Sequence, residues 1–162
     1  MKGGKMFPFR RNSRVLYLGA ASGTTASHVA DVCSEGMVYC VEISQRSFRE
    51  LVQVCEKRRN MVPILSDATK PSGYRFVVDR ADVVYQDVAQ KNQASILARN
   101  MQEFSAKDGM LALKARSEDV TVMPEVVFEQ ARKTLVGSGL TVLDVCDLGP
   151  YEKDHAMIAV SR

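Results

Sequence analysis

A small-residue turn and the two threonines that follow it are the first residues of this chain whose types and spacing point to chemistry. The apolar run of residues 15–18 leads into the turn Gly19-Ala20-Ala21-Ser22-Gly23, and Thr24 and Thr25 come next. Small residues let the backbone approach a ligand closely, and a helix that begins at the threonines presents free N–H groups and hydroxyls. The pattern is typical of a strand, turn and helix that bind a nucleotide-type cofactor.

A carboxylate at the end of the second apolar run sharpens this prediction. Glu42 follows Gly19 by roughly 20 residues, where an α/β cofactor domain places the carboxylate that accepts hydrogen bonds from a ribose diol. The dinucleotide fingerprint G-x-G-x-x-G is absent, because Ala21 and Thr24 stand where it requires glycine. These residues favour S-adenosylmethionine, which has no pyrophosphate, over NAD. A plain strand-turn-helix without a ligand is the alternative.

Length and composition indicate one globular domain over residues 1–162, with a short basic lead-in over residues 1–13. The chain is 46% hydrophobic and carries a net charge of +3. No apolar stretch is long enough to span a membrane and the N-terminus lacks a signal-peptide core, so we expect a cytoplasmic protein. The four cysteines are widely separated, which predicts reduced core thiols and no metal site.

The elements that must position these residues alternate along the chain, which predicts an α/β fold. Strands are expected over residues 14–19, 37–43, 62–66, 82–87, 109–115, 140–145 and 155–160. Helices are expected over residues 24–33, 44–58, 91–105 and 124–136. The segment between the last two strands is too short for a crossover helix, so these strands should pair antiparallel. A mostly parallel sheet with a C-terminal antiparallel hairpin is the Rossmann-like plan of class I S-adenosylmethionine-dependent methyltransferases.

Six segments resemble, in order, the motif series of fibrillarin-type RNA 2′-O-methyltransferases of the archaeal type. They are VLYLGAASGTTASHVAD, VEIS, RRNMVPILSDATKP, DVVYQDVAQ, LKARSEDVT and PYEKDHAM. Members of this family carry a small domain and a lysine-bearing helix before the first motif, whereas fourteen residues precede Val15 here. The sequence therefore departs from the family at its N-terminus. Neither Lys2 nor Lys5 is assigned the place of the lysine that this helix supplies.

The resemblance implies a cofactor site for S-adenosylmethionine. Thr24 and Thr25 would line its methionine part, Glu42 would hold the ribose hydroxyls, and Ile43 would pack beside the adenine. Asp67 would read the adenine amino group, although a turn or helix cap is the alternative for this residue. The expected cofactor-binding residues are Gly19, Ala20, Thr24, Thr25, Glu42, Ile43, Asp67, Ala68, Asp87, Val88, Ala89 and Gln90.

The resemblance also implies that Asp87, Lys114 and His155 are catalytic. Methyl transfer to a ribose requires the hydroxyl oxygen in line with the methyl group and losing its proton. Lys114 would act as the base or orient the hydroxyl, and Asp87 would position Lys114 and favour the sulfonium. An adjacent carboxylate favours a charged lysine, whereas a base must be neutral, so both roles stay open. His155 would orient the ribose or a phosphate. Arg116 would meet an RNA phosphate where Ser117 starts a loop.

By this resemblance the chain is the catalytic subunit of a guide-directed C/D-box ribonucleoprotein that methylates ribosomal RNA, with transfer RNA as a possible further substrate. The implied partners are the C/D-box guide RNA, the target RNA, a Nop-domain scaffold protein and a kink-turn-binding ribosomal-type protein. A catalytically weak, cofactor-binding subunit of the same particle is the alternative. An NAD-dependent oxidoreductase is disfavoured by the broken glycine fingerprint.

Overall fold

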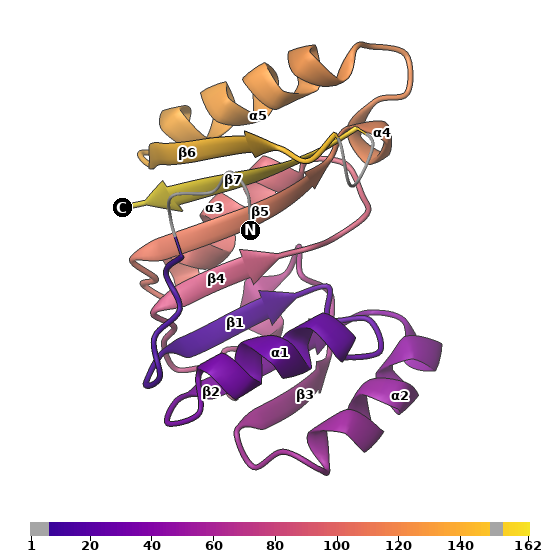
Figure 1. The fold of residues 1–162 in the computed structure, drawn as a ribbon, viewed down its shortest axis with the longest axis vertical. Coiled ribbons are helices and arrows are strands. Elements are labelled where there is room, and N and C mark those ends of the chain that lie inside the picture. The colour runs from indigo at the N-terminus through magenta and orange to yellow at the C-terminus, as the bar shows by residue number, and fades with distance from the viewer. Residues whose placement is uncertain (1–6, 150–153) are drawn as a thin grey trace.

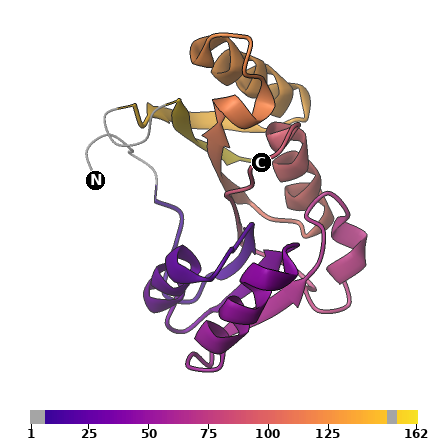
Figure 2. The ribbon, with the colours of Figure 1, turned by 90° about the vertical axis from the view of Figure 1, so that its right-hand side faces the viewer.

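A seven-stranded sheet with helices on both faces organises the chain in the computed structural model, which describes residues 7–149 and 154–162 (Figures 1 and 2). The strands are β1 (Arg14–Leu18), β2 (Met37–Glu42), β3 (Met61–Leu65), β4 (Val83–Gln86), β5 (Asp108–Lys114), β6 (Thr141–Asp147) and β7 (His155–Ser161). The helices are α1 (Thr24–Val32), α2 (Gln45–Cys55), α3 (Gln93–Glu103), α4 (Ala115–Glu118) and α5 (Pro124–Gly137), with a 3₁₀ turn, η1 (Pro71–Tyr74).

The strand order β3-β2-β1-β4-β5-β7-β6 confirms the predicted sheet. The strands β1 to β5 pair in parallel, and β7 lies antiparallel between β5 and β6. Every strand and helix expected from the sequence forms, and no end differs from its expected position by more than three residues. The short helices η1 and α4 were not predicted, because a single turn leaves no apolar period to detect.

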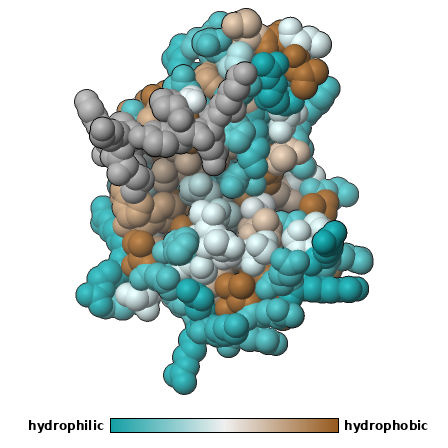
Figure 3. All heavy atoms as spheres, turned by 45° about the vertical axis from the view of Figure 1, so that its right-hand side comes forward, coloured by the Kyte–Doolittle hydropathy of each residue, from teal (hydrophilic) through white to brown (hydrophobic). Residues whose placement is uncertain are grey.

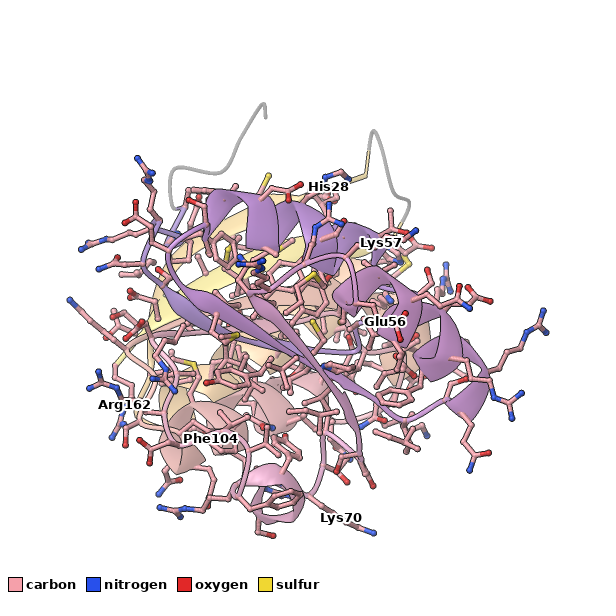
Figure 4. The ribbon with its side chains drawn as sticks, turned by 90° about the horizontal axis from the view of Figure 1, so that it is seen from below. His28, Glu56, Lys57, Lys70, Phe104 and Arg162 are labelled. Atoms are coloured by element: carbon pink, nitrogen blue, oxygen red, sulfur yellow. The ribbon has the colours of Figure 1, made fainter. Side chains whose placement is uncertain are left out.

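Two apolar cores hold the layers together. The helices α1 and α2 pack on one side of the sheet, and α3 and α5 pack on the other. Figure 4 places His28 of α1 and Phe104, which follows α3, on opposite sides of the sheet. Three of the four free cysteines are buried, as expected of core thiols, and Cys146 is half-buried. Within the described ranges, no helix has both the length and the apolar character needed to cross a bilayer.

The functional edge of the sheet follows from its strand order. The chain runs from β1 outward to β2 and β3, then crosses back to β4 on the other side of β1. Open α/β sheets bind ligands outside the carboxyl ends of their strands at such a switch point. The turn after β1 and the residues after β4 therefore meet there: the N–H of Asp87 donates to the carbonyl of Leu18 at 2.9 Å.

A substitution at Leu111 measures how much the apolar core contributes to the stability of the fold. Its side chain is fully buried in the core that faces α3 and α5. Leu111→Ala should lower the free energy of unfolding by about 2–5 kcal/mol, because it removes buried apolar area and leaves a cavity. Urea denaturation measures this loss. Val136→Ala, at a half-exposed position of α5, should change stability by less than about 0.5 kcal/mol, and equal losses in both variants would contradict the assignment of this core.

Candidate functional site

A cavity of about 340 Å³ opens at the carboxyl edge of the parallel strands. Figure 3 views this edge obliquely, with pale residues of intermediate hydropathy in its middle and hydrophilic side chains around them. The volume is within the range of small-molecule sites. The lining residues are Gly19, Ala21, Val41, Glu42, Ile43, Ser47, Ser66, Asp67, Ala68, Asp87, Val88, Ala89, Gln90 and Lys114.

Only glycine fits at position 19, because two backbone segments approach each other closely where this residue lines the cavity. Its φ is +79°, and a Cβ atom at this position would lie 2.3 Å from the carbonyl oxygen of Asp87. Neither the conformation nor the space tolerates a side chain. The absence of a side chain thus lets the end of β1 and the end of β4 form a continuous surface.

Glu42 ties together the two turns that border the cavity. Its buried carboxylate accepts the N–H of Ala21 at 2.8 Å through Oε2 and the N–H of Ser44 at 2.7 Å through Oε1. A carboxylate has about four acceptor positions, so capacity remains for hydroxyl donors on the cavity side. The glutamate predicted from the sequence as a ligand acceptor therefore also fixes the local backbone.

Asp67 combines the two roles that the sequence left open. It lines the cavity, and its Oδ1 accepts both the N–H of Thr69 at 2.9 Å and the Thr69 hydroxyl at 2.7 Å. These two hydrogen bonds, with a smaller contribution from the Lys70 ammonium, hold the pKa of Asp67 below its usual range. The turn thus keeps an ionised acceptor at the cavity wall.

Asp87 and Lys114 form an ion pair between neighbouring strand ends. Asp87 follows β4, Lys114 ends β5, and Lys114 Nζ lies 2.7 Å from Asp87 Oδ1. The side chains are 32% and 25% exposed, so the pair remains accessible from the cavity that both residues line. The structure therefore brings together two of the three residues expected to be catalytic.

His155 lies beside this pair as the cross-strand neighbour of Lys114. The N–H and C=O of Lys114 bond the side chain of Gln93 rather than β7. The two residues therefore form a non-hydrogen-bonded antiparallel pair, in which side chains lie close on one face of the sheet. His155 is half-buried, and it is not among the residues that line the cavity.

Ala20, Thr24 and Thr25 do not line the cavity, although the sequence placed them among the cofactor residues. Both threonines are exposed in the first turn of α1. Burial, with Tyr85 and Asp87 nearby, raises the pKa of Tyr17. Ala21, from the turn before the threonines, does line the cavity, and contact of Ala20, Thr24 and Thr25 with the cofactor stays a prediction.

The expected local structure at Ser117, one of the two residues assigned to RNA, requires a correction. Ser117 does not start a loop; it lies in α4. The Arg116 side chain is already engaged within the protein, since its Nε lies 2.9 Å from Asp154 Oδ2 and its Nη1 donates to the carbonyl of Val120 at 3.1 Å. Contact of these residues with RNA stays a prediction.

Four lining residues were not predicted from the sequence: Ala21, Val41, Ser47 and Ser66. Each is close in sequence to a residue that was predicted. Ser47 lies in the first turn of α2, which follows Glu42, and Ser66 directly precedes Asp67. His28, which we did not assign to the site, is exposed on α1 (Figure 4). Lys2, Lys5 and residues 150–153 of the last motif lie outside the described residues.

Known proteins resemble this chain in sequence and in fold. The sequence profile of the Fibrillarin family matches residues 1–162. A fibrillarin-like rRNA/tRNA 2′-O-methyltransferase of Methanopyrus kandleri is 53% identical over 161 residues, covering 98% of this chain and 69% of the relative.

Solved structures agree with the sequence match. Aeropyrum pernix fibrillarin with natively bound S-adenosyl-L-methionine superposes with a TM-score of 0.88 at 45% identity, covering 98% of this chain and 70% of the other. The fibrillarin chain of a fibrillarin/Nop5p complex gives a TM-score of 0.93 at 42% identity, covering 98% and 77%. At this identity and coverage, the chain belongs to the fibrillarin family.

Proposed function

We propose that this protein is an S-adenosylmethionine-dependent RNA 2′-O-methyltransferase that acts on ribosomal and transfer RNA. The observation that carries the proposal is the 2.7 Å ion pair of Asp87 and Lys114 at the rim of a cavity that also presents Glu42. A cofactor acceptor and a pair of charged groups for a hydroxyl substrate thus share one edge of the sheet. The archaeal relatives, which are named as rRNA/tRNA 2′-O-methyltransferases, support the same reaction.

The cavity residues fit the parts of the cofactor. The free acceptor positions of Glu42 suit a ribose diol, exposed Ile43 offers an apolar surface to adenine, and ionised Asp67 suits an exocyclic amino group. The methionine part would run past Gly19 toward the Asp87–Gln90 segment, where the bare backbone leaves room. The bound cofactor supplies an electrophilic methyl group on a sulfonium.

We assign Lys114 the role of orienting the target ribose hydroxyl. Its Nζ lies 2.7 Å from the Asp87 carboxylate, and an ammonium donates hydrogen bonds but has no lone pair with which to accept a proton. Asp87 holds this ammonium in place and adds negative charge near the position of the sulfonium. His155, as the cross-strand neighbour of Lys114, would contact the same nucleotide from the side of β7.

The enzyme would work within a ribonucleoprotein. The solved complex of a family member with Nop5p supports a Nop-domain protein as its partner. We further propose a C/D-box guide RNA, which would select the target nucleotide by base pairing, a kink-turn-binding ribosomal-type protein in the same particle, and a cytoplasmic location. Single-turnover methylation of a guide-paired RNA, with and without the scaffold, tests this assembly. Efficient site-selective methylation by the isolated chain would overturn the dependence on partners.

Glu42→Ala should weaken S-adenosylmethionine binding by about 1.5–3 kcal/mol, the usual contribution of hydrogen bonds to a charged group. Isothermal calorimetry measures the affinity, and circular dichroism verifies that the variant is folded. The matched control is Glu35→Ala, which removes an exposed carboxylate that pairs with Arg11 just before β2 begins. Unchanged affinity in folded Glu42→Ala protein would refute the ribose assignment.

Thr69→Val should raise the pKa of Asp67 toward its ordinary range, because the variant lacks the hydroxyl that stabilises the carboxylate. A carboxyl with a lowered pKa stabilises the folded state above its unfolded pKa, and this contribution is lost as pH falls through the folded pKa. The stability difference between wild type and variant should therefore shrink in acid. NMR titration measures the pKa.

An internal control for this titration is Asp119, whose pKa is also held low by a threonine hydroxyl and N–H two residues later, at Thr121. Its pKa should be the same in wild type and Thr69→Val. A shift at both aspartates, or at neither, would contradict the local cause assigned to Asp67.

Lys114→Ala and Asp87→Ala should each slow single-turnover methylation by about 10²-fold or more, and their effects should not add, since the two groups act as a pair. Lys114→Ala should leave cofactor affinity nearly unchanged. Glu103→Gln, which alters another 2.7 Å ion pair away from the cavity, is the control and should retain the wild-type rate. Near-normal turnover of Lys114→Ala would remove this residue from the mechanism.

A further inference from the structure

A glutamine outside the cavity holds the backbone of Lys114. Gln93 is the first residue of α3, and its side chain is fully buried. The Lys114 N–H donates to Gln93 Oε1 at 3.0 Å, and Gln93 Nε2 donates to the Lys114 carbonyl at 3.0 Å. One amide side chain therefore satisfies both backbone groups of the lysine.

The need for this contact follows from unequal strand lengths. The last residue of β4, Gln86, pairs with Leu111, whereas β5 continues through Lys114. The backbone of Lys114 consequently points past the end of β4, where no further strand residue pairs with it. A primary amide carries the same donor and acceptor as a peptide group, so Gln93 extends the ladder by one rung.

Further hydrogen bonds fix Gln93 from two sides. Its N–H donates to Glu118 Oε1 at 2.6 Å, and Glu118 belongs to α4, which begins immediately after Lys114. Its carbonyl accepts Gln86 Nε2 at 2.7 Å, and Gln86 is the residue directly before Asp87. The network thus connects the backbone on both sides of the Asp87–Lys114 ion pair.

We propose that Gln93 is a positioning residue for Lys114: it fixes the end of β5 so that the ammonium meets both Asp87 and the substrate hydroxyl. The inference rests on the catalytic role proposed above for Lys114. An ammonium on a flexible four-carbon stem makes a poorly defined contact unless its backbone is fixed. Displacement of a reacting group by about 1 Å can cost 10²-fold in rate.

The variant that tests this role is Gln93→Met, which keeps the side-chain length and removes both hydrogen bonds. Methylation should slow by about 10- to 100-fold in single turnovers at saturating cofactor and RNA, while the cofactor dissociation constant should stay within about twofold, because Gln93 does not line the cavity. Asn60→Ala is the matched control. The Asn60 amide donates to two backbone carbonyls, of Ala30 and Cys33, just before β3 begins, so its loss should lower stability without slowing methylation.

Two further measurements separate positioning from a general loss of stability. In Gln93→Met, exchange of the Lys114 amide hydrogen should accelerate at least about tenfold relative to that of Leu113, because the Lys114 N–H has lost its acceptor. In a double-mutant cycle, Gln93→Met should slow wild-type enzyme but cause no further loss in a Lys114→Ala background. A merely structural role would lower both rates alike.

The outcomes are distinct. Faster Lys114 exchange, a slower rate and a non-additive cycle support the proposal. Faster exchange with an unchanged rate, while Lys114→Ala is inactive, overturns the positioning role and leaves the proposed function standing. A Lys114→Ala enzyme that turns over normally overturns the positioning role together with the catalytic role of Lys114, whereas only a wild-type protein that fails to methylate RNA overturns the proposed function. If Gln93→Met does not fold, Gln86→Met removes only the hydrogen bond to the Gln93 carbonyl and should give a smaller loss of the same kind; an additive cycle for that variant overturns the proposal.

Discussion

The close approach of two backbones at Gly19 and Asp87 is the constraint on which the site depends. Parallel pairing of β1 with β4 brings these residues together, and the lack of a side chain at Gly19 lets them touch. This contact sets where Asp87 projects. Because β5 is the next strand, it also sets where Lys114 must lie to reach the carboxylate. The position of the ion pair is therefore a consequence of strand order.

The ion pair contributes little to holding the fold together. Pairs that keep solvent access are worth at most about 1 kcal/mol, and Asp87 and Lys114 are each more than a fifth exposed. The buried amides of Gln86 and Gln93 cost more to disrupt, because a buried donor or acceptor without a partner costs about 1–3 kcal/mol. The buried amides behind the site therefore contribute more to stability than the ion pair does, and the charged groups in front remain available to a ligand.

The sequence predicted most of the sheet and much of the site, for identifiable reasons. The strands and helices could be predicted from the spacing of apolar residues, and Glu42 from its position at the end of an apolar run. Both signals depend only on residues that are close together in the sequence. Thr24 and Thr25 are not among the residues that line the cavity, so their contact with the cofactor stays a prediction. Gln93 was not predicted from the sequence. A polar residue at a helix start looks solvent-exposed, and its burial depends on β4 ending before β5 does, which only the paired strands reveal.

Two carboxylates that line the cavity already accept hydrogen bonds from backbone N–H groups of nearby residues in the folded chain. Glu42 closes two turns and Asp67 closes a third, so the acceptor atoms are fixed by hydrogen bonds of the folded chain. A site whose acceptor atoms are already fixed loses little conformational entropy when a ligand binds. Methyl transfer needs that rigidity, since the reacting oxygen must lie in line with the methyl group. The same hydrogen bonds that shape the turns thus serve the alignment that the reaction requires.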